Sequence, residues 1–364
     1  MKAPRVKVDD ASAEPVGGAV GGAAWLAHGR IPALDGLRAV GVLLVILSHA
    51  AVTRGFPVSG SEAGLGRLGT VGVDVFFVLS GFLITSLLCR ERDRSSRISL
   101  GAFYVRRVLR IVPAYVCFLL FVAALSFTGR AAVARADWLA AATYTMNFRA
   151  HPAWEVGHIW SLSIEEHFYL LWPPLFAFLP RRAAIVGLAG VLLFEAIVRI
   201  AILSWSPAMS VETELWTFTR LDPIAAGCLL ALISRSPAGF RSLEVVVRRW
   251  PVAAALVIAA TAGSMLSGKF EMGVAPSLSA LALAALVWSA IRSEPRWLET
   301  RLIVTIGVGS YSLYLWQEVF LNPGRLEWWT RFPQNLAFVA LFAALSYRLI
   351  EQPFVRIKQR RATR

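Results

Sequence analysis

Long apolar segments recur along the whole chain and are separated by short polar loops. Each is close to the ~20 residues that an α-helix needs to cross the hydrocarbon core of a bilayer. The pattern predicts ten spans, at residues 36–54, 70–89, 111–128, 162–179, 183–203, 216–234, 251–268, 274–291, 303–321 and 334–350. A further apolar stretch at 137–147 is too short to cross, and we expect a half-helix or an interfacial segment there.

The composition of the whole chain agrees with this pattern of membrane spans. Hydrophobic residues make up 57% of the 364 positions and charged residues only 16%, which leaves no room for a sizeable soluble domain. We expect an all-α integral membrane protein, a multi-pass bundle of about ten transmembrane helices in the cell (inner) membrane. Residues 31–357 would form the membrane domain, between a flexible cytoplasmic tail at 1–30 and a basic cytoplasmic tail at 358–364.

The net charge of +14 indicates topology and not nucleic-acid binding, because the arginines fall in short loops between apolar segments. When the ten spans are threaded with the N-terminus inside, 27 of the 37 lysines and arginines lie on the inner side and 8 on the outer side. Positive charge concentrates on the cytoplasmic side of membrane proteins. Both termini are therefore predicted to be cytoplasmic.

Arg38 and His49 are the most informative polar residues inside the predicted spans. They lie eleven residues apart in one helix, so they share a face and are separated by about 16 Å along the axis. A histidine at such depth can act as a general base if a carboxylate orients it, and Asp74, Glu165 or Glu166 could do so. The alternative is a histidine that merely packs against a neighbouring helix.

Glu165 and Glu166 are adjacent, so their side chains point ~100° apart and are not expected to face the same cavity. Glu165 shares its face with Ser161 and Tyr169. Either glutamate could instead pair with Arg220 and hold helices together. His158, Arg220 and Asp222 lie near the predicted outer side, where they are candidates for contact with a substrate.

Arg106, Arg107 and Arg110 form a cluster at the inner side. Two of them are four residues apart on one helix face, and the planar guanidinium group suits phosphate. The cluster could equally bind lipid headgroups. Together with the deep histidine, it favours a phosphate-bearing cytosolic substrate. Ser80 lacks the G-x-S-x-G context of an esterase nucleophile, and we expect it to mark close helix packing.

Seven motifs in order resemble the integral-membrane acyltransferase-3 family, bacterial O-acyltransferases that act on carbohydrates. They are LDGLRAVGVLLVILSHA, GVDVFFVLSGFLIT, FYVRRVLRIVPAY, HIWSLSIEEHFYLLWP, RLDPIAAGCLLA, GSYSLYLWQ and YRLIEQPFVR, from residue 34 to 356. The resemblance implies a fold of about ten transmembrane helices. It also implies transfer of an acyl group, often acetyl, from cytosolic acyl-CoA to a hydroxyl group.

The resemblance also suggests roles for individual residues. It makes His49 the catalytic base, with Glu165 and Glu166 as further site candidates. Arg106, Arg107 and Arg110 would contact the donor, with Arg38 on the path inward. The chain departs from the family where the motif that often ends in histidine ends in Gln317. The C-terminal esterase-like domain of many relatives does not follow the membrane domain in this sequence.

The sequence therefore predicts a membrane O-acyltransferase that uses acyl-CoA as donor substrate and carries neither a metal nor a permanently bound cofactor. The expected acceptor is a cell-surface or lipid-linked glycan. A macrolide or another glycosylated secondary metabolite is an alternative acceptor. A solute transporter is the alternative from another class, since charges on both sides of a bundle also suit alternating access.

Overall fold

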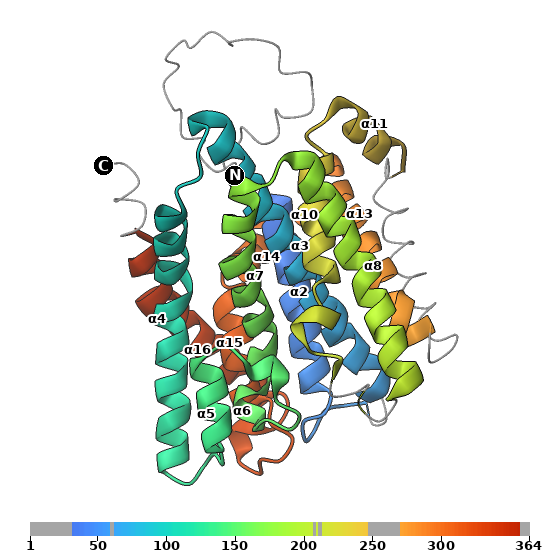
Figure 1. Cartoon of the computed structure of the whole chain (residues 1–364). Helices are drawn as coiled ribbons and strands as arrows, with labels where there is room; N and C mark the ends of the chain where they lie inside the picture. Colours follow the sequence, from blue (N-terminus) through green and yellow to red (C-terminus); the bar gives the residue numbers. More distant parts are fainter. Residues whose placement is uncertain (1–30, 59–61, 207–208, 210–212, 247–269, 357–364) are drawn as a thin grey trace.

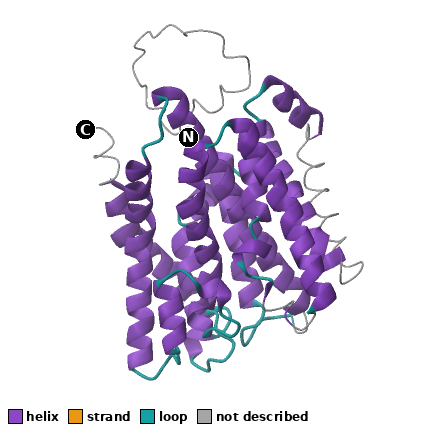
Figure 2. Cartoon of the chain, viewed as in Figure 1, coloured by secondary structure: helices purple, strands orange, loops and turns teal. Residues whose placement is uncertain are grey.

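The computed structural model describes residues 31–58, 62–206, 209, 213–246 and 270–356 of the chain. Within these ranges every regular element is a helix, as Figure 2 shows. The helices are α2 (Pro32–Ala50), α3 (Glu62–Ser95), α4 (Leu100–Phe127), α5 (Arg135–Ala142), α6 (Trp154–Gly157), α7 (Ile159–Phe178), α8 (Arg181–Trp205), α10 (Asp222–Ile233), α11 (Pro237–Val246), α13 (Ala275–Ser293), α14 (Arg301–Val308), α15 (Ser310–Phe320) and α16 (Gln334–Ser346). Single turns of 3₁₀-helix occur at η1 (Met146–Phe148), η3 (Thr217–Thr219) and η5 (Trp328–Thr330), and π-helical turns at η4 (Phe270–Val274) and η6 (Tyr347–Glu351). The prediction of an all-α membrane protein is confirmed.

Six helices of the described ranges are long and apolar enough to cross a membrane: α2, α3, α4, α8, the continuous η4–α13 helix and the helix Gln334–Arg356. The pair α10 and α11, bent by 119°, would make a seventh. The predicted fourth span is α7, which carries two glutamates, and the predicted ninth is divided at Gly309 into α14 and α15. The predicted span 251–268 lies outside the described residues. The count of ten therefore stays a prediction.

The short apolar segment 137–147 does not cross the bundle. The chain forms the eight-residue helix α5, turns, and continues into η1. Arg149 and the backbone N–H of Ala153 both donate hydrogen bonds to the buried Asp137, which fixes the turn. In Figure 1, α5 and α6 lie at the lower end of the bundle, whereas α2 begins, and the described chain ends, at the upper end.

Helix α3 lies at the centre of the bundle and crosses its neighbours at glycines. A Cβ atom added to Gly81 would lie 2.1 Å from the carbonyl oxygen of Ile224 in α10, and one added to Gly227 would lie 2.1 Å from that of Val78. Gly72 and Gly41 make a similar approach between α3 and α2. Because lipid gives helices little hydrophobic reason to associate, such close backbone contacts supply much of the packing energy.

Replacing Gly81 with alanine is expected to destabilise the protein by about 1–3 kcal/mol, because the methyl group forces α3 and α10 apart. Thermal unfolding of the purified protein in detergent would measure the loss. Gly66→Ala is the matched control on the same helix, since nothing lies within 4 Å of its added Cβ. Equal melting temperatures for the two variants would contradict this account of the crossing.

Candidate active site

A cavity of about 490 Å³ lies among α2, α3, α4, α7, α15 and η6. Its wall includes Ile31 at the start of α2, Arg90 near the C-terminal end of α3, and Phe76 and Tyr314 further along the helices. Sequence segments separated by more than 300 residues therefore meet around one space. Some of the polar residues predicted from the sequence line this space, and others lie outside it.

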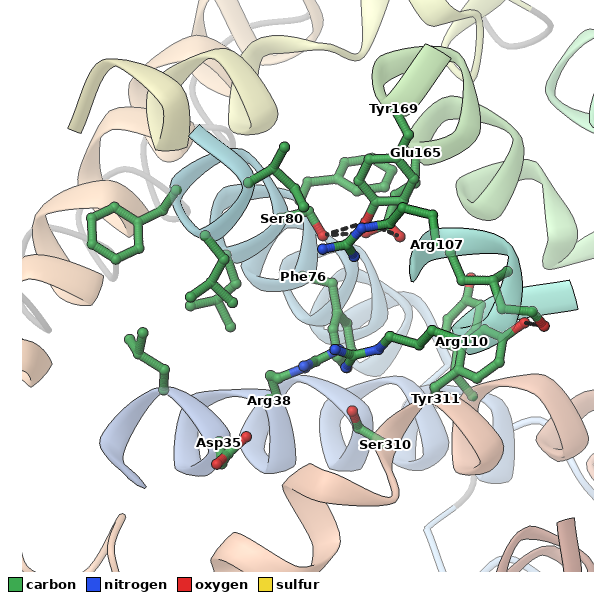
Figure 3. A pocket seen from close by; sticks show the side chains of 18 of the residues that line it. Asp35, Arg38, Phe76, Ser80, Arg107, Arg110, Glu165, Tyr169, Ser310 and Tyr311 are labelled. Carbon is green, nitrogen blue, oxygen red and sulfur yellow. Dashed lines mark hydrogen bonds between the residues drawn. The ribbon is translucent and has the colours of Figure 1, made fainter. Parts of the chain in front are cut away.

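Arg38, Arg107 and Arg110 line the cavity from α2 and α4 (Figure 3). The guanidinium groups of Arg38 and Arg110 point toward one another in this view, although like charges repel. In the described part of the chain, none of the three forms an ion pair with a carboxylate. Arg107 lies over the ring of Tyr169, with 5.2 Å from its guanidinium carbon to the ring centroid. Convergent, unpaired guanidinium groups of this kind suit a phosphate-bearing ligand.

Arg106 is placed differently from the rest of its cluster. Its guanidinium group lies 3.4 Å from a carboxylate oxygen of Glu91 on α3, and it does not belong to the cavity wall. The helical period does not explain the difference, because Arg106 shares a face of α4 with Arg110, which lines the cavity; one turn earlier on that face, Arg106 meets Glu91 of α3 instead. The structure therefore brings three of the four predicted donor-binding arginines together and leaves the fourth outside.

Ser80, Glu165 and Tyr169 form a hydrogen-bonded cluster on the cavity wall (Figure 3). Ser80 donates to one oxygen of Glu165 at 2.7 Å, and the hydroxyl of Tyr169 donates to the other at 3.2 Å. The expectation that the small pair Ser80–Gly81 marks close helix packing holds at Gly81, which makes the close approach to α10, whereas Ser80 faces α7 and bonds to Glu165.

Glu165 and Glu166 both line this cavity, which contradicts the expectation that only one of them could face it. The ~100° between adjacent side chains is correct for a helix. The cavity extends around this part of α7, between α4 and α15, and is therefore lined by both side chains. Cavity width depends on how the helices pack, so helical spacing alone did not reveal it.

His49 lies beyond the lower end of the cavity and contacts residues of α15. Its Nδ1 is 2.7 Å from Oε1 of Gln317, and its Nε2 is 3.4 Å from Oε1 of Glu318. Trp154 packs edge-on against the imidazole ring, with 5.8 Å between centroids. The carboxylate nearest His49 is therefore Glu318, and neither Asp74 nor Glu165 contacts this histidine in the described structure.

Glu318 also binds His158, which sits buried at the start of α7. One carboxylate oxygen of Glu318 accepts the backbone N–H of His158 at 3.1 Å and lies 2.9 Å from its Nδ1. The other ring nitrogen faces the carbonyl oxygen of Leu315 at 3.1 Å, and a carbonyl can only accept. Both ring nitrogens of His158 therefore face oxygen atoms, and its ring and the Glu318 carboxylate form a buried pair.

Asp74, Arg220 and Asp222 belong to buried ion pairs away from both His49 and the cavity wall. Asp74 pairs with Arg220 at 2.9 Å, so the alternative pairing of Arg220 with Glu165 or Glu166 is not what the structure shows. Asp222 accepts two hydrogen bonds from Arg199 of α8, at 2.9 and 2.8 Å. These contacts join α3, α8 and α10, and they give Arg220 and Asp222 protein partners where a substrate was predicted.

Two aromatic rings separate His49 from the cavity. Tyr314 is held by hydrogen bonds to Ser161 (2.5 Å) and to the backbone oxygen of His158 (2.9 Å). Phe76 packs edge-on against Tyr314, with 6.3 Å between centroids. Its ring lies beside Gly41, between the levels of Arg38 and His49 on α2. Phe76 and Tyr314 thus lie between the arginines of the cavity and His49.

Residues 31–347 match the family described as "Acyltransferase domain", acyltransferase 3. The chain belongs to this family. The chain is 30% identical to "O-acetyltransferase OatA" of Staphylococcus aureus (strain NCTC 8325 / PS 47) over 357 residues, which cover 89% of this chain and 57% of the relative. The protein of the same name from strain COL matches to the same extent. The chain thus spans little more than half the length of these relatives. No solved structure matches it.

Family membership confirms the resemblance found in the sequence motifs, and it favours acyl transfer over solute transport. The residues that sequence reasoning missed are Gln317 and Glu318. Both directly follow SYSLYLW, which belongs to one of the motifs that carried the resemblance. The glutamine at position 317, where the family motif often has a histidine, was the sequence feature that could have drawn attention to them. Their closeness to His49 could not be inferred, because it joins positions 268 and 269 residues apart.

Proposed function

We propose that this protein is a membrane O-acetyltransferase that moves an acetyl group from cytosolic acetyl-CoA to a hydroxyl group of a glycan. The observation that carries the proposal is a cavity lined by three arginines without carboxylate partners, which ends next to a histidine paired with a carboxylate. The relatives named O-acetyltransferase support acetyl as the transferred group. The proposal places the protein in the inner membrane with both termini in the cytoplasm, as the distribution of arginines favours.

The donor would enter from the arginine end of the cavity. Arg38, Arg107 and Arg110 would bind the diphosphate of coenzyme A, because all three line the cavity and, among the described residues, none of them forms an ion pair with a carboxylate. His49 lies eleven helical residues beyond Arg38, which is about 16 Å. A pantetheine arm is long enough to carry the thioester over this distance, between Phe76 and Tyr314. The acceptor would approach His49 from the opposite end of the bundle.

The chemistry assigned to His49 follows from its two contacts. With Nδ1–H donating to Gln317, the lone pair on Nε2 is available to an acceptor hydroxyl. The hydroxyl oxygen attacks the thioester carbon while its proton moves to Nε2, and the carbon–sulfur bond breaks. Glu318 stabilises the imidazolium that forms, and the proton then passes to the sulfur to give free coenzyme A. Gln317, which accepts the Nδ1–H, therefore takes the orienting role for which Asp74, Glu165 and Glu166 were candidates, and Glu318 supplies the nearby negative charge.

Glu165 and Glu166 remain candidate site residues under this proposal, because both line the path of the donor. The hydrogen bonds from Ser80 and Tyr169 hold the Glu165 carboxylate at the wall. It is in position to contact the amide groups of the pantetheine arm. Arg220 and Asp222 would hold the helices that surround the site and would not touch the substrate.

Purified protein in detergent or liposomes is expected to release coenzyme A from acetyl-CoA labelled in its acetyl group, and to pass the label to a glycan acceptor. Thin-layer chromatography or mass spectrometry of the acceptor would detect the new ester. A macrolide or a related glycoside offered in parallel would test the alternative acceptor. Acetyl-CoA that stays intact with every acceptor, or crosses the liposome membrane unchanged, would refute the proposal and favour a carrier.

A further inference from the structure

Arg90 adds a fourth arginine to the cavity, apart from the cluster that the sequence singled out. It lies near the C-terminal end of α3 and lines the cavity. Its side chain is partly exposed, as expected for a residue at an opening. Arg110 lies about one turn further along α4 than Arg107, and its guanidinium group points toward that of Arg38.

The acidic neighbours of Arg90 are engaged by other arginines. Glu91 pairs with Arg106 of α4, and Asp93 pairs with Arg235 of the loop that follows α10. Arg92 donates to the backbone oxygens at the end of α7. Within the described ranges Arg90 makes no ion pair and no hydrogen bond through its side chain. Its guanidinium group therefore faces the cavity with its donors available.

The separation between Arg90 and the other arginines has a chemical consequence. Arg90 follows Ser80 by ten residues on α3, which corresponds to about 15 Å along the helix axis. Arg107 lies between these levels, because its neighbour Arg106 contacts Glu91 and its own guanidinium group covers Tyr169. The cavity thus offers cationic groups at two depths, which suits a ligand with two separate phosphate groups.

We propose that Arg90 binds the monophosphate on the ribose of the coenzyme A donor, while Arg38, Arg107 and Arg110 bind the diphosphate. The assignment rests on the proposed function, since it takes acyl-CoA as the donor. In coenzyme A the diphosphate lies between the ribose and the pantetheine arm. A donor whose thioester points toward His49 therefore places its ribose phosphate on the side of the opening, where Arg90 lies.

The test compares acetyl-CoA with acetyl-3′-dephospho-CoA, which lacks only the ribose phosphate. The unaltered protein is expected to show a KM about tenfold lower for acetyl-CoA, the effect of one charge-assisted contact. Arg90→Gln is expected to raise the KM for acetyl-CoA about tenfold, with kcat and the KM for the dephospho donor unchanged. Arg94→Gln is the matched control: this arginine lies one turn further along α3, is exposed and does not line the cavity.

The outcomes separate this inference from the function on which it rests. Equal KM values for the two donors in the unaltered protein would overturn the role of Arg90 and leave the acetyltransferase in place. An equal rise for both donors in Arg90→Gln would also overturn it. No turnover of either donor would overturn the proposed function and this inference with it. Direct binding of CoA and dephospho-CoA to the unaltered protein gives the same comparison without any variant.

Discussion

Replacing His49 with alanine is expected to lower the kcat of acetyl transfer by about a thousandfold. The substitution removes the imidazole whose Nε2 is assigned the role of base; the ring nitrogens of the nearby His158 already face Glu318 and Leu315. General-base catalysis by a positioned side chain contributes about 10²–10⁴-fold. The measurement is the rate of ester formation with saturating acetyl-CoA and acceptor.

The KM for acetyl-CoA should stay within about twofold of its value in the unaltered protein, because the arginines that bind the donor are untouched. His167→Ala is the matched control: this half-buried histidine of α7 bonds to Thr217 and faces a separate apolar pocket. Glu318→Gln should lower kcat about a hundredfold, with partial recovery in Glu318→Asp. Full transfer by His49→Ala would refute the mechanism, and an equal loss in His167→Ala would show only damage to the fold.

Replacing Arg199 with methionine is expected to destabilise the protein by about 3–5 kcal/mol, the cost of breaking a buried ion pair by removing one partner. Arg199 lies on α8 and is 7% exposed. It makes two hydrogen bonds to Asp222 and further bonds to the backbone oxygens of Thr219 and Gly273. Without it, Asp222 and the neighbouring Glu195 remain as buried carboxylates that have lost their cation.

Thermal unfolding in detergent and the yield of folded protein would measure this loss. Arg67→Met is the matched control, since Arg67 pairs with Glu271 at the surface, where such a pair contributes about 0–1 kcal/mol. A melting temperature of Arg199→Met equal to that of the control would contradict the structural role of this network. Recovery of stability in Arg199→Met combined with Asp222→Asn would confirm that the unpaired carboxylate carries the cost.

Helical periodicity was enough to place Arg38 and His49 on one face of α2, and Arg107 and Arg110 at the donor end. These relations are local, because they depend only on the angle and rise per residue within one helix. Helical periodicity could not identify the carboxylate that lies next to His49. Asp74, Glu165 and Glu166 were plausible by depth in the membrane, but depth does not say which helices are adjacent. The packing of α15 against α2 places Glu318 there.

The same distinction explains Arg220 and Asp222, which looked like substrate contacts because charges in a membrane usually face a cavity. Their pairing with Asp74 and Arg199 depends on how α3, α8 and α10 cross. By itself the sequence determined the helical class and the family, and it singled out His49 and the arginines of α2 and α4 as candidates, since these follow from hydropathy, spacing and motifs. Only the tertiary structure decided which carboxylate faces His49, that Arg106 is replaced by Arg90 at the cavity, and which charges stabilise the bundle. Contacts between helices far apart in sequence fix these features, and no periodicity within one helix encodes them.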